Sequence, residues 1–176
     1  MENAAAHRIC GLLGVKHVDI SLDFMKTHFK SSLLDGSIPD GHYDDENMRS
    51  VVVPFRNGIM LSILAGIADS HGFDEIMLAN HSGDHFIYPD CRPEFISSIS
   101  DSISHGTDGR VSVVAPFTNM TKSDIVKLGA EIGVPFELTY SCYKGRDRHC
   151  GVCGTCIERK EAFEQAGIVD PTTYEE

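Results

Sequence analysis

The chain alternates short, extended apolar segments with longer segments in which apolar residues recur at helical spacing. Strand character, with apolar and β-branched residues between polar turns, occurs at residues 15–21, 51–53, 75–79 and 111–117. Helix signals occur at residues 2–14, 22–31, about 57–71, 93–105, 121–133 and 154–166. Strands and helices that alternate at this spacing form βαβ units, so the pattern predicts an α/β fold with a parallel, doubly wound sheet. We expect a single domain over residues 1–176.

Three finer expectations follow from the same sequence. Thr121 and Asp124 have the spacing of a capping box at the start of a helix. The tail from residue 168 onward carries few apolar anchors and is expected to be loosely held. The helix that begins near Asn57 is predicted to bury one face, formed by Met60, Ile63, Leu64 and Ile67.

Composition and charge narrow the class of protein. Hydrophobic residues make up 41% of the chain and charged residues 23%, as in an ordinary globular protein. The formal net charge of −11 argues against nucleic acid or an anionic membrane as the main partner. The N-terminus lacks the pattern of a signal peptide, and no apolar run approaches the roughly 20 residues of a membrane span. We therefore expect a cytoplasmic protein with reduced thiols.

Four of the six cysteines lie close together near the C-terminus. They are Cys142, Cys150, Cys153 and Cys156, with the spacing C-x7-C-x2-C-x2-C. This pattern favours a structural zinc ion held by four thiolates within a segment of residues 139–166. An iron–sulfur cluster is the main alternative, because C-x2-C-x2-C also occurs in ferredoxins, and free thiols or a redox pair are less favoured. Cys10 is expected to be a small core residue, and Cys91 is either a small buried residue or part of the polar loop at 80–92.

Three polar loops follow the predicted strands. They lie around Arg56 and Asn57, at residues 80–92, and at residues 119–122. Ligands of open α/β sheets bind at the carboxyl ends of the strands, so we expect these loops to form the binding site. The loop at 80–92 carries two histidines, two aspartates, a tyrosine, a cysteine and an arginine, more polar groups than a plain connection needs.

The residue types in these loops suggest roles. Asp84 or Asp90 is suited to accept hydrogen bonds from an amine-bearing heterocycle, and Arg56 or Arg92 to hold a carboxylate or phosphate. Lys122 lies in the first turn of its helix, where an anion is favoured. Structural alternatives remain open: a salt bridge at the helix start for Arg92, and a solvated side chain for Lys122. A metal site at His81, Asp84 and His85 is disfavoured by its spacing, and the acidic run 44–46 is interpreted as solvated surface.

Four sequence motifs, in this order along the chain, resemble the QueC family of 7-cyano-7-deazaguanine synthases. They are VVPFRNGIML, GDHFIYPDCRPEF, TKSDIVKLG and SCYKGRDRHCGVCGTCIERKEAF. The resemblance implies a Rossmann-like fold of the PP-loop (adenine nucleotide alpha hydrolase-like) type, with a structural zinc site near the C-terminus. The four clustered cysteines match the zinc ligands of the family.

The resemblance also implies a reaction. Members convert 7-carboxy-7-deazaguanine and ammonia into the nitrile 7-cyano-7-deazaguanine (preQ0) for queuosine biosynthesis, using ATP with Mg²⁺. The expected intermediates are an acyl adenylate and an amide, and relatives suggest a homodimer. The FRN segment, the 80–92 loop and Lys122 match motifs around the family's active cleft. We expect catalytic roles for Asp84, His85 and Lys122, and substrate or cofactor binding by Arg56, Asn57, His81, Tyr88, Asp90 and Arg92.

The chain departs from the family in one motif. No SGGxDS-type phosphate loop occurs in the 176 residues, and the first strand of the fold is expected to be missing. On this basis Met1 is expected to be an internal start or a fragment boundary, and the chain alone to bind ATP poorly and be marginally stable. A catalytically inactive, zinc-stabilised binding module is the alternative function. Another PP-loop enzyme, such as a tRNA-modifying thiolase or an amidoligase, is a third hypothesis that the acidic charge disfavours.

Overall fold

The computed structural model describes residues 1–42 and 49–175, and the chain divides into two compact units. The first unit comprises Met1–Val53 with Ser123–Glu176, and the second comprises Pro54–Lys122. The single domain inferred from the sequence stays a prediction. The acidic run at 44–46 lies outside the described residues.

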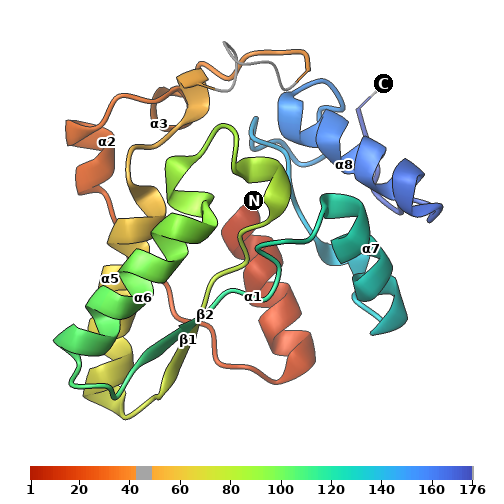
Figure 1. Ribbon diagram of the computed structural model, residues 1–176. Coiled ribbons are helices and arrows are strands. Elements are labelled where there is room, and N and C mark those ends of the chain that lie inside the picture. The colour runs from red at the N-terminus through yellow and green to blue at the C-terminus, as the bar shows by residue number, and fades with distance from the viewer. Residues whose placement is uncertain (43–48, 176) are drawn as a thin grey trace. The chain divides into compact units, whose positions relative to one another are not determined.

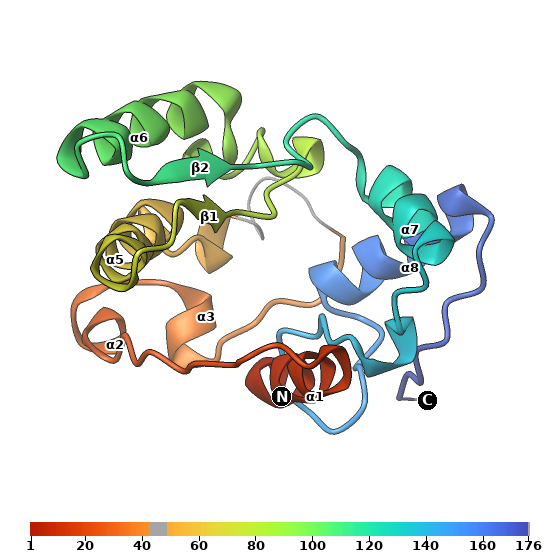
Figure 2. The same ribbon diagram turned by 90° about the horizontal axis from the view of Figure 1, so that it is seen from below.

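The second unit contains a short parallel sheet with a helix beside each strand. It comprises α5 (Arg56–His71), β1 (Glu75–Met77), η1 (Ser82–Asp84), η2 (Pro89–Cys91), α6 (Pro93–Gly106) and β2 (Ser112–Val114). β1 and β2 pair in parallel, with Ile76 opposite Val113. Figure 2 shows α5 beside β1 and α6 beside β2. The strands predicted at 75–79 and 111–117 are present but shorter, and the helices predicted at about 57–71 and at 93–105 are confirmed as α5 and α6, so a parallel α/β arrangement is present in this unit.

The core of the second unit lies between these helices and strands. Its buried members are Leu61, Ala65, Ala68, Ile76, Ile103 and Val111. The predicted buried face of α5 is correct only in part. Leu64 packs against the core and Ile63 and Ile67 are half-buried, whereas Met60 is exposed and the fully buried residues are Leu61, Ala65 and Ala68. Most side chains in the middle of α5 are apolar or small, so the periodicity did not specify which face is buried. The small alanines let the helix approach the sheet closely.

The start of α5 has an unusual backbone. Phe55, the residue that precedes the helix, has a φ of 55°, a left-handed conformation that few non-glycine residues adopt. Its ring covers Gly58 one turn later and meets the ring of Phe95 edge-on at 5.7 Å between centroids. A Cβ atom at Gly58 would lie 2.4 Å from the Phe55 ring. Glycine at position 58 is therefore required for this packing.

We expect Gly58→Ala to destabilise the protein by about 1–3 kcal/mol, because the Phe55 ring must be displaced. Gly66 in the same helix is a matched control, since nothing lies within 4 Å of a Cβ atom there. Gly66→Ala should stabilise the protein by up to about 1 kcal/mol through helix propensity. Thermal unfolding of both variants tests this, and equal shifts of Tm in the same direction would contradict it.

The first unit is mainly helical. It comprises α1 (Glu2–Leu13), α2 (Phe24–His28), α3 (Ser32–Asp35), α7 (Lys122–Glu131, which begins at the last residue of the second unit), η3 (Phe136–Leu138) and α8 (Gly154–Ala166). Figure 1 shows α7 and α8 as neighbouring helices. One core cluster joins them through Val126, Ala162 and Phe163, and a second surrounds the four cysteines.

The helices at both ends of the sequence agree with prediction. α1 ends at Gly14 in the left-handed conformation, and α8 covers the predicted residues 154–166. The predicted helix at 22–31 is instead two short helices, α2 and α3, separated by extended backbone at Phe29 and Ser31.

Two predicted strands are absent from the described residues. Residues 15–21 pair with no other strand, and Val15, Val18 and Ile20 are exposed. Val51 and Val53 are buried but lie outside any sheet, and Pro54 follows them. Strand-like composition reflects a suitable side-chain pattern, whereas a strand also requires a hydrogen-bonding neighbour. The larger doubly wound sheet therefore stays a prediction for this chain.

One segment of the described residues, Arg49–His71, is long and apolar enough to cross a membrane. The expectation that no apolar run approaches this length was therefore wrong. The C-terminal part of the segment is α5, whose residues Leu61, Ala65 and Ala68 belong to the core. The core position of α5 accounts for its apolar composition without a bilayer.

Candidate metal centre and candidate active site

The four predicted metal ligands come together in the first unit. The Sγ atoms of Cys142, Cys150, Cys153 and Cys156 all lie within 4.8 Å of one another, and all four residues are buried. Around one zinc ion with Zn–S bonds of about 2.3 Å, tetrahedral sulfur atoms are roughly 3.8 Å apart. The Cys150 and Cys156 sulfur atoms are 4.0 Å apart. The arrangement fits a single ion, whereas an iron–sulfur cluster would place several more atoms between the ligands.

Local backbone structure orients the four thiols toward one another. The Cys150 N–H donates to the Cys142 sulfur at 3.4 Å, and the Cys153 N–H donates to the Cys150 sulfur at 3.3 Å. Gly151, with a φ of 72°, makes the tight turn between Cys150 and Cys153. Cys153 then precedes the first residue of α8, so Cys156 lies within the first turn of that helix. The short spacings of the sequence therefore become a preformed site.

The pKa values of the clustered thiols are shifted in opposite directions, which suits the binding of a metal ion. The hydrogen bond from the Cys156 thiol lowers the pKa of Cys153 to about 3, and the same bond raises the pKa of Cys156 above its usual range. Burial raises the pKa of Cys150. The Cys153 thiolate is thus stabilised, while Cys150 and Cys156 favour the protonated form. A divalent ion would replace those protons, so metal binding is expected to release protons.

A second layer of side chains surrounds the cysteines. The His149 Nε2 atom accepts a hydrogen bond from the Ser141 N–H at 3.0 Å, and burial holds the pKa of His149 below its usual value. His149 is therefore neutral, with its proton on Nδ1. The rings of Tyr140 and Tyr174 lie on this imidazole, with centroids 4.6 and 5.8 Å away. Both tyrosines also pack against the cysteine cluster.

The C-terminal tail is bound to this layer, so the expectation of a loosely held tail was wrong. His149 forms a parallel bridge with Tyr174, and the Glu175 N–H donates to the His149 carbonyl at 2.8 Å. Another segment, at Asp40, forms an antiparallel bridge with Cys153. The cysteine loop is therefore held between two segments that are distant in sequence.

A buried ion pair joins α8 to the tail. Arg159 Nε donates to Asp170 at 3.2 Å, and its other nitrogens reach Thr139, Ser141 and the Phe136 carbonyl. Burial alone would raise the pKa of Asp170. Hydrogen bonds from Tyr174 and Thr172 and the charge of Arg159 outweigh it and hold that pKa below its usual value. Sequence analysis missed this pair, because Arg159 lies in the charged run ERKE of α8 and has no local sign of burial.

The three polar loops predicted from the sequence meet within the second unit. Ser82 donates to the Met120 carbonyl through its N–H at 3.0 Å and its Oγ at 2.8 Å, which joins the loop after β1 to the loop after β2. The Asp90 carboxylate accepts from the Asn57 N–H at 2.8 Å, which joins the first of these loops to the start of α5. The convergence expected at the carboxyl ends of parallel strands is thus observed.

Asp90 and Asn57 form a buried junction. The Asn57 side chain donates to the Asp90 carbonyl at 3.1 Å and to the Cys91 sulfur at 3.2 Å. Asn80 donates to the Cys91 carbonyl at 2.8 Å. Burial, together with the negative charges of Asp84 and Asp90, raises the pKa of the Cys91 thiol to about 12. Cys91 is buried and protonated, and Asp90 satisfies one backbone donor, the Asn57 N–H, at the N-terminus of α5.

His81 and Asp84 form a second pair in the same loop. The Gly83 N–H donates to His81 Nδ1 at 3.2 Å, so the proton of neutral His81 is on Nε2, which lies 3.2 Å from Asp84 Oδ2. Burial lowers the pKa of His81 and outweighs the opposing effect of Asp84, while Lys122 and His85 add to the decrease. His81 is therefore a neutral donor that orients the Asp84 carboxylate.

The remaining predicted residues lie at the edge of this cluster. Arg92 Nε donates to the His85 carbonyl at 2.8 Å, and Arg56 and Arg92 are both exposed. Tyr88 and Lys122 are half-buried. Among the described residues, His85 Nε2 is buried and lacks a hydrogen-bond partner. A buried polar atom without a partner costs free energy, so a ligand group or water is expected there. The individual roles assigned to these loop residues remain predictions.

Comparison with known proteins places the chain in a family. The family model described as "Queuosine biosynthesis protein QueC" matches residues 1–167. The chain belongs to this family.

Individual relatives show the same similarity. A protein of Porphyromonas gingivalis named 7-cyano-7-deazaguanine synthase is 56% identical over 165 residues, which cover 93% of this chain and 75% of the relative. Proteins with the same name from Desulfotalea psychrophila and Brucella ovis are 51% and 52% identical over 168 residues. Those matches cover 94% and 93% of this chain and 77% and 72% of the relatives.

Proposed function

We propose that this protein converts 7-carboxy-7-deazaguanine and ammonia into 7-cyano-7-deazaguanine with the use of ATP. The family match over residues 1–167 carries this proposal, supported by relatives more than half identical that are named for this product. The substrate carboxylate would be activated as an acyl adenylate, and ammonia would displace AMP to form an amide. A second activation of the amide oxygen would allow its loss and yield the nitrile. A cytoplasmic location and a homodimer are parts of the same proposal.

Residues of the second unit supply groups suited to these steps. Lys122 at the start of α7 offers a positive charge for phosphate oxygens, with Mg²⁺ expected to accompany ATP. Asp84, oriented by His81, offers a carboxylate that can accept from the amine groups of the heterocycle. His85 offers a buried nitrogen that lacks a partner among the described residues. Arg56, Asn57, Tyr88, Asp90 and Arg92 complete the proposed binding residues, with Asp90 and Asn57 maintaining the loop junction.

Zinc is the metal proposed for the four cysteines, because four buried thiolates at these separations suit a tetrahedral structural ion. Four sulfur ligands leave no open coordination position for water. Its expected contribution is therefore stability of the cysteine loop and the start of α8.

The test is turnover by the purified 176-residue chain loaded with zinc. ATP, ammonium and 7-carboxy-7-deazaguanine are supplied, and 7-cyano-7-deazaguanine and AMP are measured by mass spectrometry. Lys122→Met should reduce the rate at least about tenfold, because removal of a charged transition-state contact has effects of this size or larger. Lys127→Met, in the same helix at an exposed position, is the matched control and should keep the rate. A folded, zinc-loaded chain that forms no product, both alone and with an N-terminal extension that carries an SGGxDS-type phosphate loop, would contradict the proposal and favour a zinc-stabilised binding module.

A further inference from the structure

The C-terminal tail lies against the four-cysteine cluster. Residues 170–175, which we call the tail strap, include Tyr174, whose side chain packs against the cluster. A Cβ atom at Gly151 would lie 3.5 Å from the Tyr174 ring, so the ring covers the tight turn between Cys150 and Cys153. The family model matches residues 1–167, so membership of the family does not account for the tail strap.

Two cations of α8 hold Tyr174 in this position. The Tyr174 hydroxyl donates to Asp170 Oδ2 at 2.6 Å, and Asp170 is itself paired with Arg159. The Lys160 Nζ atom lies 4.2 Å from the centroid of the Tyr174 ring and donates to the Gly151 carbonyl at 3.0 Å. A cation over the face of an aromatic ring is attracted to it. Lys160 therefore joins the ring to the turn that the ring covers.

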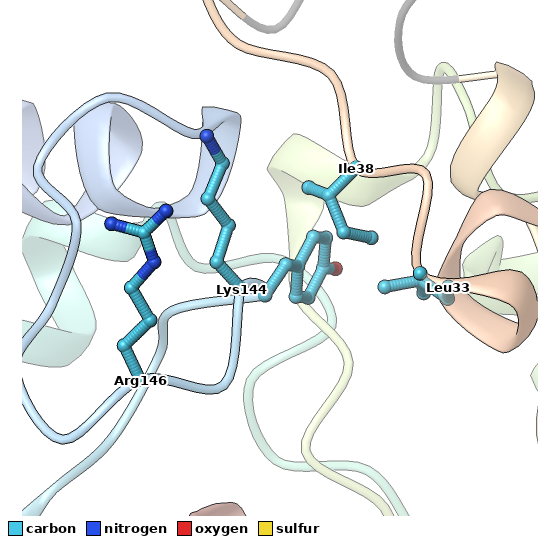
Figure 3. Close-up of a pocket in the computed structure, with 6 residues that line it drawn as sticks. Leu33, Ile38, Lys144 and Arg146 are labelled. Atoms are coloured by element: carbon cyan, nitrogen blue, oxygen red, sulfur yellow. The ribbon is translucent and has the colours of Figure 1, made fainter.

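The end of the tail strap also reaches the cysteine loop. The Glu175 carboxylate pairs with Arg146 of that loop. In Figure 3, Arg146 and Lys144 extend side by side from the loop, beside a cavity of about 350 Å³. The residues that line this cavity are Leu33, Gly36, Ile38, Tyr143, Lys144 and Arg146. Its wall packs against the cluster through Ile38 and Tyr143, so the cysteines are covered by this wall and by the tail strap.

Of these two covers, the tail strap is the one suited to open. It forms neither helix nor sheet, and its ion pair is 55% exposed at Arg146 and 31% exposed at Glu175, which makes the pair weak. Segments held by few buried contacts open at a low cost in free energy. Because Cys153 and Cys156 are fully buried, a chelator in solution reaches the ion only after a covering segment moves. Most of the cost of moving the strap lies in the contacts of Tyr174.

We propose that the tail strap closes the metal centre and that its opening sets the rate at which the ion leaves. With the strap closed, the Tyr174 ring and Lys160 cover the turn between Cys150 and Cys153. With the strap open, that turn is exposed and a competing ligand reaches the sulfur atoms. Linkage requires the reverse effect as well, since an ion that binds better beneath the closed strap also holds the strap closed. This inference concerns the metal centre alone and does not depend on the proposed reaction.

The test measures transfer of zinc from the loaded chain to an excess of the coloured chelator pyridylazoresorcinol, followed by absorbance. Tyr174→Ala should speed the transfer about tenfold or more, because it removes the half-buried ring on which closure depends. Tyr174→Phe keeps the ring and should recover most of the wild-type rate. Val169→Ala is the control in the same tail, because Val169 is 88% exposed, and it should change the rate less than about twofold.

A second control separates the strap from general stability. Gly58→Ala, which weakens the core of the second unit, should keep the wild-type transfer rate. Equal rates in the wild type and Tyr174→Ala overturn the proposal, and so does a chain that binds no zinc. Acceleration in Gly58→Ala as large as that in Tyr174→Ala also overturns it, because release would then follow global unfolding. A turnover experiment without product counts against the proposed reaction and leaves these outcomes unchanged.

Discussion

Removal of the metal is expected to unfold the cysteine loop and release the C-terminal tail. Cys153 and Cys156 are fully buried, and residues 139–153 form no helix or sheet and are held only by isolated bridges and single hydrogen bonds. Structural zinc contributes about 10–16 kcal/mol in small zinc peptides, so its loss should exceed the effect of any single side chain. Hydrogen exchange with and without a chelator should show protection lost at residues 140–156 and 172–175. The core of the second unit should keep its protection.

Cys153→Ser should reproduce the effect of the chelator and lower the zinc content from about one ion per chain to near zero. Cys10→Ser is the control, because Cys10 is half-buried in α1 and lies outside the cluster. Zinc content should also fall as the solution is acidified, since the thiols must lose protons to bind the ion. Unchanged exchange in the cysteine loop after complete removal of the metal would refute a structural role for it.

Arg159→Met is expected to destabilise the protein by about 3–5 kcal/mol, because it leaves Asp170 buried without its charged partner. The two side chains are only 9% and 12% exposed. Asp170→Asn should also be destabilising, and the double variant should cost less than the sum of the two single changes. Arg110→Gln, which removes an ion pair with Asp69 in which Arg110 is 59% exposed, is the control and should change Tm little.

The Asp170 contribution should also depend on pH. The pKa of Asp170 in the folded protein lies below its ordinary value of about 3.9, so the folded state favours the ionised form. The contribution is complete above that ordinary value and is lost as the pH falls through the lower, folded-state pKa. Denaturant unfolding at several pH values should show the stability difference between the wild type and Asp170→Asn shrinking in acid. A difference that stays constant down to pH 2 would contradict this account.

The sequence was most informative where interactions are local. The spacing of Cys150, Cys153 and Cys156 predicts three sulfurs on one turn, and the structure places them there with Cys142. Helix ends at Gly14 and Gly72 have the left-handed conformation expected of terminal glycines. Polar loops after β1 and β2 meet because parallel strands end at the same edge of a sheet. Each of these features depends on residues a few positions apart or on a general rule of chain direction.

The sequence was least informative where burial and pairing decide the outcome. Val15, Val18 and Ile20 have strand composition but no partner strand in the described residues. The uniformly apolar α5 could have buried several faces, and its small residues determined which one packs closely. Asp90 is a residue type that often binds ligands, and it lies in a polar loop. Its carboxylate nevertheless caps a helix that begins 34 positions earlier in the chain, at Arg56.

By itself, the sequence determined the α/β class of fold, the cluster of four cysteines and the loops that carry the candidate chemistry, because periodicity, cysteine spacing and turn residues act over short distances. Only the tertiary structure decided that the tail binds the cysteine loop, that Arg159 and Asp170 form a buried pair, and that Lys144 and Arg146 line a cavity with Tyr143. These features join residues that are distant in the chain or place the side chains of Lys144 and Arg146 in the wall of a cavity. They arise from packing and from the need to satisfy buried polar groups, which local patterns do not encode.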